Sequence, residues 1–243
     1  MDFLNTIKIF SIQHFLVIIL LYGLIAIGLF YVRKNIDNKK NINSLLFVLS
    51  ILLLFFWITC RISHIYHSID EGIFENFFGQ KRYYNWLMIL PNSFCSFIGL
   101  VLPFIIITKK YKDSKFIEAT YSMAILGLVT NTIYPDYIVR MPFYQFRVFG
   151  SILYHVLCGF IMIVLLITGY LKPKLKNWYY TPLALVMMIS FGFFELFFLS
   201  FPESFNITKP LVPGVFLTNL VFLCIGYIIV DLLFRLIFQK IVK

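Results

Sequence analysis

The sequence predicts an all-α fold, a bundle of seven transmembrane helices that forms a single domain over residues 1–243. Of its residues, 60% are hydrophobic and only 13% are charged, which is more apolar surface than a soluble domain of this length can bury. Apolar runs long enough to cross the hydrocarbon core of a bilayer recur along the whole chain. Basic residues collect in every second connection between these runs. Together these observations indicate a polytopic membrane protein.

The seven expected spans follow one another closely, at residues 14–32, 42–63, 86–108, 118–135, 148–170, 181–200 and 213–236. The first span lacks a small-x-small cleavage site, so we expect no cleavable signal peptide. Residues 64–85 are acidic and aromatic, and are expected to include a short interfacial helix. The abundance of Phe, Ile, Lys and Asn is typical of an AT-rich coding sequence and indicates a bacterial plasma membrane.

Lys and Arg cluster in four segments, namely residues 33–40, 109–115, 172–176 and the tail with Arg235, Lys240 and Lys243. The positive-inside rule places these segments in the cytoplasm, so the N-terminus is expected outside and the C-terminus inside. The net charge of +10 could indicate a nucleic-acid partner. Because the lysines lie in short loops between helices, we expect no nucleic-acid binding.

Polar residues concentrate in the outer halves of the predicted spans, and these include all four histidines. The inner halves are almost purely apolar, and the cytoplasmic ends are expected to carry only Lys and Arg. Polar and ionisable groups are costly in hydrocarbon and usually face the interior of the bundle, where they mark a functional site. The sequence therefore predicts a polar cavity that opens to the outside.

Two residues in this outer half form a reactive pair by type, the thiol of Cys95 and the imidazole of His155. At a rise of about 1.5 Å per residue, both are expected at similar depth below the outer boundary. Pro91 is a candidate first residue for the helix of the third span, which would place Cys95 in the second turn, near the positive end of the helix. A thiol with an adjacent imidazole base is the minimal machinery for acyl transfer.

Other polar residues are expected to support this pair. Candidate donors to a developing oxyanion are Asn92, Ser93 and Asn131, and Tyr154 is expected to shape the pocket. His14 and Glu195 are expected to support the substrate site from behind. Two roles are open for Glu195, which could orient His155 or pair with Arg61.

The remaining cysteines, Cys60, Cys158 and Cys224, are interpreted as packing residues. No Cys-x-x-Cys pair occurs, so neither a disulfide framework nor a zinc ribbon is expected. His64 and His67 lie three residues apart, as a metal pair does, but no third ligand follows nearby. We expect no metal and no other cofactor.

The order of these motifs resembles the YwaF-like integral membrane protein family, which is related to the transmembrane protein 164 phospholipid acyltransferase family. The first span carries Phe10-Ser11-Ile12-Gln13-His14, and the third carries Leu90-Pro91-Asn92-Ser93-Phe94-Cys95. A Gly-containing helix runs from Gly127 to Pro135-Asp136, and an aromatic segment at Phe143–Arg147 precedes His155.

The resemblance implies an acyltransferase that moves fatty acyl chains between phospholipids, with Cys95 as nucleophile and His155 as base. The partners it implies are membrane phospholipids or lysolipids. Two alternatives stay open. The polar cavity could bind a small solute or ion in a transporter, although no inverted repeat is evident. The chain could also be a non-enzymatic scaffold or receptor.

Overall fold

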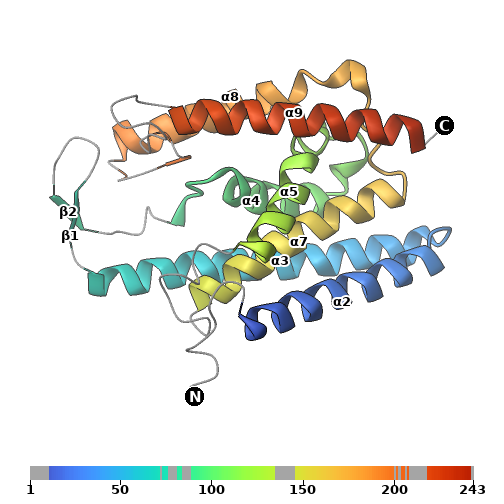
Figure 1. Cartoon of the computed structure of the whole chain (residues 1–243), viewed down its shortest axis with the longest axis horizontal. Coiled ribbons are helices and arrows are strands. Elements are labelled where there is room, and N and C mark those ends of the chain that lie inside the picture. Colours follow the sequence, from blue (N-terminus) through green and yellow to red (C-terminus); the bar gives the residue numbers. More distant parts are fainter. Residues whose placement is uncertain are drawn as a thin grey trace. The chain divides into compact units, whose positions relative to one another are not determined.

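The computed structural model describes residues 11–71, 73–75, 81–83, 89–134, 146–199, 201, 204–205, 207 and 218–241. Its α-helices are α2 (Ile12–Lys34), α3 (Lys39–Glu71), α4 (Phe94–Ile107), α5 (Lys115–Ile133), α7 (Phe146–Ile167), α8 (Tyr180–Phe198) and α9 (Thr218–Ile241) (Figure 1). Two short 3-10 helices, η2 (Lys110–Asp113) and η3 (Leu175–Asn177), precede α5 and α8. The helical class predicted from the sequence is thus confirmed for the described residues.

Six helices of the described part of the chain are long and apolar enough to cross a membrane, which makes this a multi-pass membrane protein. They are α2, α3 as far as Ser63, α5, α7, α8 together with η3, and α9. The helix α4 has 14 residues, which at about 1.5 Å per residue is shorter than a hydrocarbon core of about 30 Å. The expected third span, 86–108, therefore corresponds to a shorter helix.

Pro91 does not begin this helix, contrary to the expectation from the sequence. The helix begins at Phe94, and Ser93 caps it, because the Ser93 Oγ accepts a bond from the amide of Ser96 at 3.2 Å. A proline disfavours the helical conformation of the residue before it, which keeps Leu90 outside the helix. Cys95 consequently lies in the first turn of α4, not in the second.

The segment after the second span also differs from the expectation. The helix α3 continues two turns beyond residue 63 and ends at Glu71, directly before Gly72, since no proline or glycine interrupts it earlier. Strands β1 (Ile73–Glu75) and β2 (Lys81–Tyr83) then form an antiparallel hairpin, with Ile73 opposite Tyr83. The separate interfacial helix expected in residues 64–85 is wrong for the residues described there.

The chain forms two compact units, and the first comprises residues 1–60, 99–113 and 124–171. Within it α2 packs on α7 (Figure 1). A Cβ atom at Gly28 would lie 2.5 Å from Cζ of Phe160, and one at Gly159 would lie 2.5 Å from Cβ of Leu128. These glycines let α7 approach α2 on one side and α5 on the other. The far side of α2 exposes apolar side chains such as Ile19 and Ile27, as a lipid-facing helix does.

The second unit comprises residues 61–98, 114–123 and 172–243. In this unit α9 packs against α8 and η3. Rings from three segments meet around Phe205, with Phe94 at 5.3 Å, Phe97 at 6.3 Å and Phe191 at 6.4 Å between ring centroids. Gly192 on α8 allows this packing, because a Cβ atom there would lie 2.8 Å from the Phe205 ring.

Candidate functional site

Cys95 lies in the first turn of α4 in the second unit and is half-buried. The first backbone N–H groups of an α-helix have no acceptor within the helix, and the helix dipole makes this end positive. A thiolate is stabilised at such a position. Cys95 therefore lies beside the positive end of α4.

His155 lies on α7 in the first unit and is buried. Its Nδ1 atom is 2.7 Å from the carbonyl oxygen of Ser151, one turn earlier. A carbonyl oxygen only accepts hydrogen bonds, so Nδ1 carries the proton of the neutral ring and Nε2 keeps a lone pair. His155 is thus held in the tautomer that a general base needs at Nε2.

Tyr154 stacks on the imidazole of His155, with ring centroids 4.2 Å apart. The Tyr154 ring also lies near Gly99 of α4, where a Cβ atom would lie 3.4 Å from Cδ2 of Tyr154 and 2.9 Å from Cδ1 of Trp57. Gly99 lies one helical turn after Cys95. The glycine therefore permits a close approach of α4 to Trp57 and Tyr154 in the first unit.

His14 and Asn131 also belong to the first unit. His14 is buried, and its Nε2 atom lies 3.0 Å from the carbonyl oxygen of Thr132 on α5. The Thr132 hydroxyl in turn shares a hydrogen bond of 3.0 Å with Tyr22 of α2. His14 thus joins α2 to α5, while Asn131 is half-buried beside Thr132.

Asn92 and Ser93 lie in the second unit, directly before α4. Nη1 of Arg61 donates to Oδ1 of Asn92 at 2.9 Å, and Arg61 also bonds the carbonyls of Ile89 and Leu90. The backbone oxygen of Asn92 accepts from the amide of Phe205 at 2.8 Å. These contacts fix the orientation of Asn92, whose side-chain amide group is the part suited to donate to a ligand. The Oγ atom of Ser93 accepts the cap bond from Ser96, and its O–H group can still donate.

Glu195 on α8 is fully buried in the second unit. One carboxylate oxygen, Oε2, accepts a short hydrogen bond from the hydroxyl of Ser204. The other, Oε1, has no hydrogen-bond partner among the described residues. Arg61 lies close enough for its charge to act on Glu195. The sequence left two possible partners for Glu195, His155 and Arg61. Of these, Arg61 lies in the same unit as Glu195.

The structure thus groups the predicted site residues in two sets. Asn92, Ser93, Cys95 and Glu195 belong to the second unit, and His14, Asn131, Tyr154 and His155 to the first. The side chains of His64 and His67 lie outside the described residues.

A buried ionic network was missed by the sequence analysis. Nε of Arg235 on α9 lies 2.6 Å from Oδ2 of Asp231, and its Nη1 lies 3.0 Å from Oε1 of Glu118 on α5. Asp231 also accepts from Ser122 at 3.1 Å and from Thr181 at 2.8 Å. The prediction that the span halves opposite the histidines are almost purely apolar did not anticipate Glu118 and Asp231. Arg235 is fully buried in this network.

The spacing of Asp231 and Arg235 could have revealed this network. Opposite charges four residues apart lie on one face of a helix, and inside an apolar span they need each other and further partners. A second missed residue is Tyr227 of α9, whose ring lies 5.5 Å from that of Phe94, the residue before Cys95. A lone tyrosine in an apolar span gives no such signal in the sequence.

Comparison with known proteins places most of the chain in one family of membrane proteins. Residues 9–235 match the model of the TMEM164 family. No curated protein and no solved structure matches the chain. The matched range includes every residue proposed above for the site.

Proposed function

Because this chain belongs to the TMEM164 family, we propose that it is a membrane-embedded acyltransferase that acts on glycerophospholipids through an acyl thioester on Cys95. His155 is the general base and then the general acid. The observation that carries the proposal is the bond from Nδ1 of His155 to the carbonyl of Ser151, which leaves Nε2 available for a proton.

In the first half of the reaction, Nε2 of His155 takes the proton from Sγ of Cys95, and the thiolate attacks the ester carbonyl carbon of a phospholipid. A carbon–sulfur bond forms and the bond to the glycerol oxygen breaks. His155 returns the proton to that oxygen, and a lysolipid leaves. The acyl chain stays on Cys95 as a thioester.

In the second half, His155 takes a proton from the hydroxyl of another lysolipid, whose oxygen attacks the thioester carbonyl. The carbon–sulfur bond breaks, and the thiolate of Cys95 recovers the proton from His155. Water as acceptor gives a free fatty acid instead, so hydrolysis and transfer share the same intermediate.

The start of α4 supports this mechanism electrostatically. The first-turn N–H groups of Phe94 and Cys95 point out of the helix end, where an oxyanion needs donors. The side-chain amide of Asn92, fixed by Arg61, is a further donor. We assign Tyr154 and Asn131 to the walls of the substrate site, and His14 and Glu195 to its support.

The close approach at Gly99 supports the pairing of Cys95 with His155. Gly99 follows Cys95 by one turn on α4, and it contacts Tyr154, whose ring stacks on His155. A Cβ atom at position 99 would lie 2.9 Å from Cδ1 of Trp57, so a side chain there would push α4 away from Trp57 and the neighbouring Tyr154. Gly99, which allows this approach, lies one turn from the proposed nucleophile.

We also propose that the segment before α4 and α4 together make a seventh crossing, with the N-terminus outside and the C-terminus in the cytoplasm. The Lys-rich connections before α5 and α8 support this orientation. Fusions of a cytoplasm-active reporter after residue 113 and after residue 241 should both be active. Inactivity of either fusion contradicts the orientation.

The test of the acyltransferase is a transfer assay in proteoliposomes. The donor is phosphatidylethanolamine with an isotope-labelled acyl chain, and the acceptor is lysophosphatidylglycerol. Mass spectrometry of the lipids should show labelled phosphatidylglycerol with the wild type and with Cys224→Ala, but not with Cys95→Ala. Undiminished transfer by Cys95→Ala overturns the proposal.

A small-solute or ion transporter is the second candidate, and the network of Glu118, Asp231 and Arg235 is the observation that favours it. Ionisable residues within spans often line a transport path. Ion flux into liposomes that persists in Cys95→Ala and is lost in Asp231→Asn would favour the transporter over the enzyme.

A further inference from the structure

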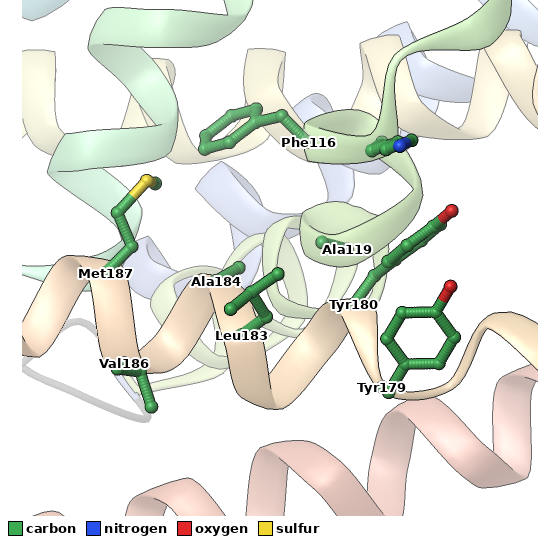
Figure 2. Close-up of a pocket in the computed structure, with 9 residues that line it drawn as sticks. Phe116, Ala119, Tyr179, Tyr180, Leu183, Ala184, Val186 and Met187 are labelled. Atoms are coloured by element: carbon green, nitrogen blue, oxygen red, sulfur yellow. The ribbon is translucent and has the colours of Figure 1, made fainter.

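A groove lies between α5 and α8 within the second unit and has a volume of 660 Å³ (Figure 2). Sites for small ligands have volumes of about 300–1,000 Å³ and apolar walls with a few polar groups. This groove has that composition, because most of its lining is apolar and Lys115, Tyr179 and Tyr180 supply the polar atoms.

The apolar part of the groove follows one face of α8. Tyr180, Leu183, Ala184 and Met187 recur at the helical spacing of three or four residues and line it. Opposite them on α5 stands Ala119, so two small side chains, Ala119 and Ala184, leave the space open (Figure 2). At about 1.5 Å per residue, this face extends roughly 10 Å along α8. An acyl chain fits a trough of this shape and polarity.

The polar end of the groove carries the positive charge of Lys115. Nζ of Lys115 lies 5.9 Å from the centroid of the Tyr180 ring, and the Lys115 side chain is exposed. Glu118, one turn along α5, is engaged by Arg235 and by the side chain of Asn177, each at 3.0 Å. Among the residues that the structure describes, no ion pair forms at Lys115. The hydroxyls of Tyr179 and Tyr180 lie together at this end of the groove (Figure 2).

The surroundings of this end are those of a membrane interface. Trp178 and Tyr179 are exposed aromatic residues, which anchor helices at the level of lipid headgroups. Lys172, Lys174 and Lys176 are exposed in the connection directly before α8. Clusters of basic residues beside transmembrane helices attract acidic lipids.

We propose that this groove binds an acidic glycerophospholipid, with the phosphate at Lys115 and the two tyrosine hydroxyls and one acyl chain along α8. An ammonium and hydroxyl donors suit a phosphate with uncompensated negative charge. A zwitterionic lipid carries its own cation beside the phosphate and gains less from Lys115. The groove therefore discriminates by headgroup charge.

This lipid site goes beyond the proposed acyl transfer and does not depend on it. The groove lies at the starts of α5 and α8, and neither Cys95 nor His155 lines it. Binding of the acidic lipid should therefore persist in Cys95→Ala. Failure of either proposal leaves the other intact.

The test is native mass spectrometry of the purified protein with equal amounts of phosphatidylglycerol and phosphatidylcholine. The wild type should retain phosphatidylglycerol preferentially. Lys115→Gln should weaken that retention about five- to tenfold, the effect of one lysine near a lipid phosphate. Lys176→Gln is the matched control, because Lys176 is also exposed but does not line the groove, and it should behave as the wild type.

A second variant fills the groove without changing charge. Ala184→Leu should reduce retention of phosphatidylglycerol by at least the same factor, with the thermal midpoint checked against the wild type. If the thermal midpoint of Ala184→Leu falls, the comparison of Lys115→Gln with Lys176→Gln tests the proposal without it. Equal retention of both lipids by the wild type, or equal effects of Lys115→Gln and Lys176→Gln, overturns the proposal.

Discussion

The Nδ1 atom of His155 lies 2.7 Å from the carbonyl oxygen of Ser151, and this contact determines which ring nitrogen can accept a proton. His14 is bonded through the opposite nitrogen, since its Nε2 lies 3.0 Å from the carbonyl oxygen of Thr132. The two buried histidines are therefore fixed as different tautomers. Of these two, it is His155 that presents Nε2, the atom at the far end of the ring, as an acceptor.

Replacement of His155 should abolish most of the acyl transfer. General base catalysis contributes about 10²–10⁴-fold to a rate, and His155→Ala should lose that factor in the proteoliposome assay. The thermal midpoint of the variant shows whether the fold persists. A folded His155→Ala that transfers at the wild-type rate would exclude His155 as the base.

Replacement of Gly99 by alanine should reduce both stability and transfer. The new Cβ atom would lie 2.9 Å from Cδ1 of Trp57 in a packed contact, and such overpacking costs about 1–3 kcal/mol. Gly23→Ala on α2 is the matched control, because no atom lies within 4 Å of a Cβ there. The control should keep or slightly raise the thermal midpoint in detergent. Equal midpoints for both variants would show that α4 has room to move at Gly99.

Loss of the cap at Ser93 should destabilise the start of α4. The Ser93 Oγ accepts from the amide of Ser96, and removal of such a cap costs about 0.5–2 kcal/mol. Ser93→Ala should therefore lower the thermal midpoint and slow acylation of Cys95, whereas Ser93→Asp, which can also cap a helix, should retain both. Similar losses in the two variants would assign Ser93 a role other than capping.

Disruption of the buried ionic network should destabilise the protein strongly. Removal of one partner of a buried ion pair leaves an uncompensated charge and costs about 3–5 kcal/mol. In Arg235→Gln the carboxylates of Asp231 and Glu118 lose their cationic partner, so the thermal midpoint of this variant should fall sharply. Arg33→Gln is the control, because Arg33 is exposed at the end of α2. A midpoint for Arg235→Gln equal to that of the control contradicts the account of the network.

Hydrophobic patterning predicted the helices well but their ends poorly. Residues 181–200 and 148–170 agree closely with α8 and α7, because long apolar runs leave little choice in a membrane. The start of α4 was predicted too early, because the apolar residues before Pro91 continue the hydrophobic pattern of the span. The cap at Ser93 and the restriction that proline places on Leu90 determine the actual start.

The residue types of the candidate site could be chosen from the sequence, but the contacts that these residues make could not be predicted. Cys95 and His155 were proposed as a nucleophile and a base from their residue types, but the tautomer of His155 depends on a backbone carbonyl that no sequence pattern encodes. Arg235 was grouped with the surface cations, because a sequence does not show that Glu118, 117 positions away, reaches it. Burial of a charge follows from tertiary packing, which joins segments remote in the chain.

The most direct test of the central claim is peptide mapping of the protein after brief exposure to a phospholipid donor without acceptor, followed by acid quench. The account predicts that the peptide with Cys95 carries the mass of one acyl chain, that hydroxylamine removes it, and that His155→Ala does not accumulate it. An acyl group found on Cys60, Cys158 or Cys224 instead, or on no cysteine while transfer proceeds, would contradict the account.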